Sequence, residues 1–256
     1  MPDDQTPPEA FLPYGEMIVD WDERLRREGP FFQRAFSSAG AQRVLDYGCG
    51  TGHHVRLFAR WGLDATGADF SPVHVEEARR RAREADAAVR FEVAEASRLP
   101  EVFTQPFDAV TCAGTLPLAG SPEAIRRAVA GMRDVLRSDG LLLLQCRNFQ
   151  TIPEGRTVVQ GPRVRQVEDR EILFLEILRK IRRRCDRTVL VLEKLAGEWT
   201  RYLHHEQAWA LAPDELEAIL TEAGFGRLQR YGACEPVPFD PETSPDLVLL
   251  ARKGKA

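Results

Sequence analysis

Cysteine is scarce and scattered in this chain, with five residues among 256 and no Cys-x-x-Cys pair. An odd number of cysteines at irregular spacing indicates neither a disulfide framework nor a zinc site, so we expect no bound metal. Cys49, Cys112 and Cys146 lie in apolar strand ends or tight loops. We expect these three to behave as small hydrophobic residues.

Long apolar runs are also lacking. The most apolar stretch, residues 141–144, is far shorter than the roughly 20 residues that a membrane helix needs. Residues 1–13 are acidic and proline-rich, and they contain neither the basic nor the apolar segment of a secretory signal. We therefore expect a cytoplasmic protein with no membrane partner.

The chain has no excess of basic residues. Its 35 Lys and Arg face 39 Asp and Glu, which gives a net charge of −4. This balance argues against a dedicated nucleic-acid binder, so we expect no DNA partner. Residues 179–184 do form a dense basic run. Its simplest interpretation is a solvated strand end, and binding of phosphate or RNA is the alternative.

Alternating strand and helix patterns fill the first half of the chain and predict a doubly wound α/β sheet with its ligand site beyond the carboxyl ends of the strands. A hydrophobic content of 43% is enough for a core. Strands are predicted at 43–47, 64–68, 89–93, 107–112 and 140–146, and helices at 52–61, 72–85 and 122–136. Ser71 and Ser121 are predicted helix caps, each followed by a proline.

The flanking regions differ from this pattern. Residues 14–38 are helical in pattern, and Gly29-Pro30 predicts a break between two helices. Residues 163–209 predict four antiparallel strands, with turns at 169–170 and 185–187. A helix at 213–223 and strands at 225–231 and 246–251 complete the sheet. We thus expect an arm and lid helices (1–40), a core (41–150), an antiparallel cap (151–210) and the last core elements (211–256).

A glycine-rich loop follows the first predicted strand. Residues 44–54 read Val-Leu-Asp-Tyr-Gly-Cys-Gly-Thr-Gly-His-His, with Asp46 at the strand end and glycines at 48, 50 and 52. A dinucleotide fingerprint would place the third glycine one residue later. The pattern Asp-x-Gly-x-Gly-x-Gly resembles motif I of the class I S-adenosylmethionine (SAM) methyltransferases. A nucleotide-dependent dehydrogenase and a purely structural turn are the alternatives.

Three further segments match this family in order and spacing. The second strand ends at Asp69, whose carboxylate can accept hydrogen bonds from both hydroxyls of a ribose. Residues 94–100 resemble the segment in which an acidic side chain and the next N–H bind adenine, which implies these roles for Glu95 and Ala96. Residues 107–114 resemble the fourth-strand motif. The resemblance implies a Rossmann-like seven-stranded mixed sheet, an N-terminal lid, an antiparallel insertion, and S-adenosyl-L-methionine as cofactor.

Segments around Trp21, Thr115 and Arg147 are similar to the small-amine branch that includes glycine and sarcosine N-methyltransferases. This likeness implies that Arg147 grips a substrate carboxylate and that Thr115 hydrogen-bonds the acceptor. His205 is a third candidate for the catalytic site. The predicted cofactor residues are Tyr14, Trp21, Arg24, Asp46, Gly48, Cys49, Gly50, Gly52, His54, Asp69, Phe70, Glu95, Ala96, Cys112 and Gly114.

The chemistry implied is SN2 transfer of a methyl group to a small-molecule acceptor, an amine or a carboxylate-bearing metabolite. Such transfer depends mainly on positioning and desolvating the acceptor. Two alternatives stay open: an RNA methyltransferase that uses the basic run at 179–184, and a SAM-binding protein without catalysis. The sequence leaves open whether the chain is a homodimer.

Overall fold

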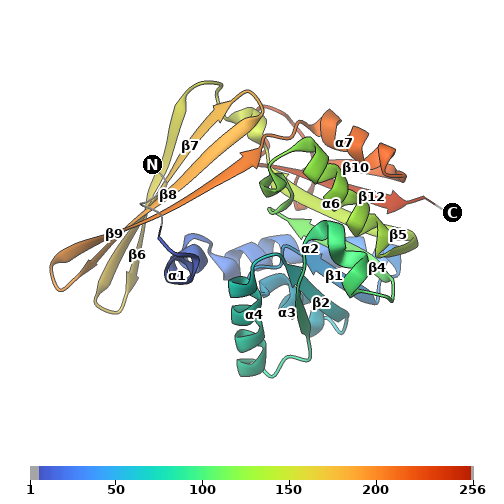
Figure 1. Ribbon diagram of the computed structural model, residues 1–256, viewed down its shortest axis with the longest axis horizontal. Coiled ribbons are helices and arrows are strands. Elements are labelled where there is room, and N and C mark those ends of the chain that lie inside the picture. Colours follow the sequence, from blue (N-terminus) through green and yellow to red (C-terminus); the bar gives the residue numbers. More distant parts are fainter. Residues whose placement is uncertain (1–5, 255–256) are drawn as a thin grey trace. The chain divides into compact units, whose positions relative to one another are not determined.

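The computed structural model describes residues 6–254, and these form two compact units (Figure 1). The larger unit comprises residues 21–151 and 211–256, and the smaller one residues 1–20 and 152–210. The arm and lid predicted as one region, 1–40, are thus divided between the units at residue 20. No helix among the described residues is both long and apolar enough to cross a membrane.

The larger unit is built on a mixed sheet with the strand order β11-β10-β12-β5-β4-β1-β2-β3. Seven of these strands are the predicted ones, and β11 is a short additional edge strand. The strands are β1 (Arg43–Tyr47), β2 (Asp64–Asp69), β3 (Arg90–Val93), β4 (Phe107–Ala113), β5 (Leu136–Arg147), β10 (Phe225–Ala233), β11 (Glu235–Pro238) and β12 (Asp246–Lys253). The predicted fold class is therefore confirmed.

Helices α3 to α6 lie between the parallel strands β1 to β5, whereas α2 precedes β1 and α7 precedes β10. The helices are α2 (Trp21–Ala39), α3 (His53–Arg60), α4 (Pro72–Glu84), α5 (Leu99–Val102), α6 (Pro122–Asp134) and α7 (Pro213–Glu222), with 3₁₀ turns η1 (Ala96–Arg98), η2 (Leu116–Ala119) and η3 (Phe149–Thr151). The two predicted serine caps are present. The Ser71 hydroxyl accepts a hydrogen bond from the N–H of His74 at 3.4 Å, and that of Ser121 from Ala124 at 3.2 Å.

Strand directions bring the functional segments to one edge of this sheet. Strands β1 to β5 are parallel, so their carboxyl ends lie together. Strand β12 is antiparallel to β5, and its first residue, Asp246, lies opposite Arg147 at the end of β5. Strand β10 is antiparallel to β12, so its carboxyl end returns to the same edge.

The predicted break at Gly29-Pro30 is wrong, because α2 continues through Pro30. The chain instead leaves the helical conformation at residues 19–20, between α1 (Pro8–Ile18) and α2. An interior proline costs a helix about 3 kcal/mol. Phe31, Phe32 and Phe36 on the same helix are buried. Burial of a phenylalanine contributes roughly 1.5–3 kcal/mol, so together these three outweigh the cost of the proline.

The smaller unit contains a four-stranded antiparallel sheet, as predicted for the insertion, and also helix α1, which we expected in the arm and lid region. Its strands are β6 (Thr157–Val167), β7 (Arg170–Ile181), β8 (Arg184–Leu195) and β9 (Glu198–Trp209), paired in that order. Helix α1 packs on one face through Phe11, Tyr14 and Ile18. The turn between β7 and β8 falls at Arg182-Arg183, so the predicted turn at 185–187 is wrong. Arg182 adopts a positive φ of 55°, which lets two residues close this hairpin.

Candidate active site

The glycine loop after β1 is folded against the end of β2. The N–H groups of Gly48 and Cys49 both donate to the carbonyl oxygen of Ala68, at 2.7 and 3.1 Å. Gly50 has a φ of +52°, and a Cβ built on it would meet no described atom within 4 Å. Glycine is favoured at such a φ, and the open space lets a ligand approach the backbone closely. The last loop glycine, Gly52, caps α3.

Asp69 links this loop to the next helix. One of its carboxylate oxygens accepts a hydrogen bond from Gly50 N–H and the other from Ser71 N–H, each at 2.9 Å. The side chain is buried. Each oxygen keeps a further lone pair, so the predicted ribose contact is compatible with these bonds.

Asp46 and Cys49 are both buried. The Asp46 carboxylate accepts a hydrogen bond from the Thr111 hydroxyl at 2.6 Å, and burial raises its pKa. Burial also raises the thiol pKa values of Cys49 and Cys112. These thiols are therefore protonated at neutral pH and serve as small buried groups, as expected. All five cysteines are buried.

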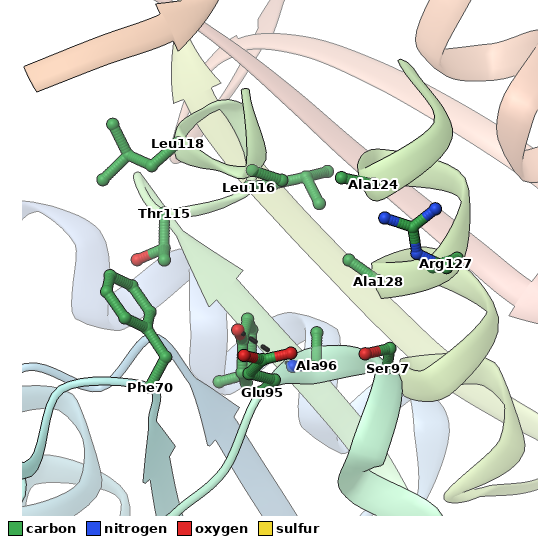
Figure 2. Close-up of a pocket in the computed structure, with 12 residues that line it drawn as sticks. Phe70, Glu95, Ala96, Ser97, Thr115, Leu116, Leu118, Ala124, Arg127 and Ala128 are labelled. Atoms are coloured by element: carbon green, nitrogen blue, oxygen red, sulfur yellow. Dashed lines mark hydrogen bonds between the residues drawn. The ribbon is translucent and has the colours of Figure 1, made fainter. Parts of the chain in front are cut away.

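A cavity of about 290 Å³ opens at the ends of β1, β2 and β4 (Figure 2). Figure 2 shows Phe70 on one side, Arg127 and Ala128 of α6 on the other, and Glu95 below. Phe70 is 49% exposed, which leaves its ring available for stacking on a flat ligand. The exposed Glu95 carboxylate can accept a hydrogen bond from an exocyclic amine. The lining therefore suits a purine base.

Tyr47 is a pocket residue that the motif did not single out. Its hydroxyl accepts a hydrogen bond from the N–H of Ala96 at 3.0 Å, the group predicted to meet adenine. Ala96 does line the cavity, but its N–H is engaged. Burial raises the pKa of Tyr47, which keeps the hydroxyl protonated.

Thr115 closes the cavity beside the glycine loop. Its hydroxyl donates to the carbonyl oxygen of Gly48 at 3.4 Å, and a Cβ added to Gly48 would come within 2.1 Å of that hydroxyl oxygen. Close packing against Thr115 therefore requires glycine at position 48. Gly114, the residue before Thr115, has a φ of +93°, and its N–H donates to the carbonyl of Gln145 at 2.7 Å.

A polar cluster from α2 lies on the other side of the loop. His54 Nε2 lies 3.0 Å from a carboxylate oxygen of Glu28. Arg24 donates from Nε to both Glu28 oxygens, at 3.0 and 3.1 Å, and from Nη2 to the Gln145 side-chain oxygen at 3.3 Å. Trp21 stacks on the ring of His53 at 4.2 Å. The structure therefore brings the predicted cofactor residues Arg24 and His54 together through Glu28, and Trp21 joins them through ring contacts with both.

A second cavity, of about 430 Å³, lies where β10 ends and β12 begins. Arg27, Glu235, Asp240 and Asp246 are the charged residues of its lining. Asn148 braces one wall, because its side-chain amide donates to two carbonyls of the 238–246 segment. Burial raises the pKa of Asp246, the residue paired with Arg147 across the strands.

Two predicted site residues lie in the smaller unit. The Tyr14 hydroxyl donates to the Glu193 carboxylate, and burial together with that bond raises the tyrosine pKa. His205 is exposed on β9, and its Nδ1 lies 2.6 Å from the Thr188 hydroxyl oxygen. These two hydrogen-bond partners, Glu193 and Thr188, belong to the smaller unit as well, and the roles of Tyr14 and His205 at the site stay predictions.

Comparison with known proteins agrees with this geometry. Residues 44–140 match the family described as "Methyltransferase domain". The glycine/sarcosine N-methyltransferase of Parasynechococcus marenigrum (strain WH8102) is 35% identical over 153 residues, which are 59% of this chain and 54% of the relative. That of Aphanothece halophytica is 31% identical over 145 residues, 56% and 55% of the two chains. The chain spans about half the length of these curated relatives.

Solved structures match over nearly the whole chain. A SAM-bound amino pentose methyltransferase from Micromonospora echinaspora superposes with a TM-score of 0.76, at 22% identity over 94% of both chains. A SAM-dependent methyltransferase from Clostridium acetobutylicum gives 0.78, at 12% identity over 95% of this chain and 96% of the other. The fold, the glycine loop and the match of residues 44–140 to a methyltransferase domain all agree with the resemblance to class I SAM-dependent methyltransferases seen in the motifs.

Proposed function

We propose that this chain transfers the methyl group of SAM to a small-molecule acceptor, an amine or a carboxylate-bearing metabolite. The observation that carries the proposal is the glycine loop closed onto Asp69 beside a cavity suited to a purine. Gly50 N–H bonds one Asp69 oxygen, and the backbone in front of Gly50 is open. A SAM molecule held there would supply an electrophilic methyl group.

The acceptor side of the site is the β5–β12 end of the same sheet edge. Arg147 ends β5, and Thr115 follows β4, the neighbouring strand. A guanidinium fork can bind a carboxylate with two parallel hydrogen bonds. The second cavity opens one strand further along, so it offers room for the rest of an acceptor. Its three carboxylates and single arginine favour binding of an amine in its protonated form. One of these carboxylates would take the proton, and the neutral amine would then attack the methyl group.

The names of the relatives support this class of acceptor. Two are glycine/sarcosine N-methyltransferases, and one structural neighbour is a sugar N-methyltransferase from Streptoalloteichus. Each of these acts on a small amine by its name. Their sequences match only part of this chain or match it weakly, so the particular amine is left to experiment.

The test is a panel of amines, amino acids, phenols and tRNA incubated with methyl-labelled SAM and the purified chain. We expect label in one of the amine or amino-acid acceptors. Binding of S-adenosylhomocysteine (SAH) and of NADH should be measured in parallel. Tight binding of NADH without binding of SAH would refute the proposal, and binding of SAH without transfer to any acceptor would favour a SAM-binding protein without catalysis.

A further inference from the structure

Glu28 is a buried carboxylate to which neither a motif nor the proposed chemistry gives a role. Its side chain is 2% exposed, in the middle of α2. Arg24 donates to both of its oxygens, and His54 lies 3.0 Å from one of them. Burial alone would raise its pKa, but the bond to His54 and the charge of Arg24 keep the pKa below its usual value. The group is therefore ionised at neutral pH.

Stability alone is a weak reason for this arrangement. Burying an ion pair removes two charges from water, and well-packed apolar residues of similar size often stabilise a fold as much or more. Elsewhere in the larger unit, Glu–Arg pairs one helical turn apart remain exposed, as with Arg80 and Glu84. The buried pair at Arg24 and Glu28 instead fixes the direction of a guanidinium and of an imidazole ring.

The guanidinium is fixed with donors to spare. Arg24 uses Nε toward Glu28 and Nη2 toward Gln145, and its Cζ atom lies 5.0 Å from the centroid of the Trp21 ring. A guanidinium carries five N–H donors, so these contacts leave donors on Nη1 for an anionic partner. His54 lies in the first turn of α3, two residues after Gly52, so its 3.0 Å contact with Glu28 places the Arg24–Glu28 pair beside the glycine loop.

The two ends of the site thus differ in chemistry. Phe70 and Glu95 line the cavity suited to the purine, on the β2–β3 side of the loop. Arg24, held by Glu28, supplies a positive charge on the β5 side, where it bonds Gln145. We propose that Glu28 is a positioning residue that holds Arg24 in place for the carboxylate of the methionine part of SAM. This inference rests on the proposed function.

The test compares two ligands that differ in that carboxylate. SAH carries the amino-acid part, whereas 5′-methylthioadenosine lacks it. By calorimetric titration, Glu28→Gln should raise the Kd of SAH about tenfold or more, because Arg24 loses its anchor. The Kd of 5′-methylthioadenosine should stay within about twofold of wild type. Glu23→Gln is the matched control, since Glu23 lies on the same helix in an exposed pair with Arg26.

A second variant keeps the test decisive. Glu28→Asp retains the charge but draws it back by one methylene group, so it should show a smaller loss confined to SAH. Equal losses for both ligands, or no loss for either, in Glu28→Asp would overturn the inference, as would a Glu28→Gln chain that does not fold. A wild-type chain that binds neither ligand would instead refute the proposed function, because the inference concerns only the difference between the two ligands.

Discussion

One oxygen of the Asp69 carboxylate accepts a hydrogen bond from the backbone N–H of Gly50 at 2.9 Å. The end of β2 is thereby tied to the loop that follows β1, although the two residues lie 19 positions apart in the sequence. The bond holds the loop at the edge of the sheet where the purine cavity opens. The same bond fixes the orientation of the Asp69 side chain before a ligand binds to it.

Asp69→Asn should therefore weaken SAH binding by about tenfold or more, since a neutral amide offers one acceptor where the carboxylate offers two. Calorimetric titration measures the change. Asp64→Asn is the control, because Asp64 begins the same strand and is exposed. An unchanged Kd in Asp69→Asn would refute a ligand contact at Asp69.

Tyr47→Phe tests the engaged N–H of Ala96. Removing the hydroxyl breaks the 3.0 Å bond and should cost about 1 kcal/mol of stability, seen as a lower melting temperature. The freed N–H would then be available to a purine, so the rise in melting temperature caused by SAH should be at least as large as in wild type. A tenfold weaker SAH affinity would instead make the Tyr47 hydroxyl itself part of the purine site.

The glycine loop, Asp69 and Glu95 could be predicted from the sequence because spacing along a βα unit fixes where strand ends meet. Glu28 was different. Its i,i+4 spacing from Arg24 predicts a pair, but the same spacing also describes exposed pairs such as Arg80 and Glu84. Only tertiary packing decides that this pair is buried against His54. The hydrogen bond between Tyr47 and Ala96 likewise joins residues 49 positions apart, so no local sequence pattern could predict it.

The helix break shows the opposite failure. Local propensity placed it at Pro30, whereas the buried phenylalanines beside that proline keep α2 continuous. A proline inside a helix costs about 3 kcal/mol of helix stability, and burial of apolar side chains on one helix face can contribute more than this. The cap strands were predictable from alternation, but the position of the β7–β8 turn depended on a positive φ at Arg182.

Acid should destabilise the smaller unit through Glu206. Burial opposes ionisation of this carboxylate, but His204 and Arg187 together lower its pKa to about 2. A lowered carboxyl pKa contributes stability that is complete above the unfolded value near 4.5 and is lost as the pH falls toward 2. We expect Glu206→Gln to lower the melting temperature at pH 7 and to flatten its decline between pH 4.5 and 3. Glu198→Gln, exposed on the same strand, should change neither.

The basic run at 179–184 is centred on the β7–β8 turn, where Arg182 and Arg183 are exposed. If it is a solvated hairpin end, Arg182→Glu with Arg183→Glu should leave methylation of the small acceptor unchanged. Arg60→Glu with Arg83→Glu, a double reversal at two exposed positions of the larger unit, controls for the change in net charge. Turnover of tRNA that falls steeply with salt, and that the double reversal abolishes, would favour the RNA alternative.

Arg147 is the residue on which the acceptor assignment depends most. It ends β5 opposite Asp246, at the edge shared with the glycine loop. If its guanidinium binds a substrate carboxylate, Arg147→Lys should raise the KM for the acceptor about thirtyfold, since a lost bidentate contact costs about 2 kcal/mol. The Kd of SAH and the melting temperature should stay near wild type. Arg137→Lys, at the other end of the same strand, should leave KM unchanged. An Arg147→Lys chain that melts earlier but keeps its KM would show that Arg147 braces the strand end and that the acceptor is recognised without a carboxylate.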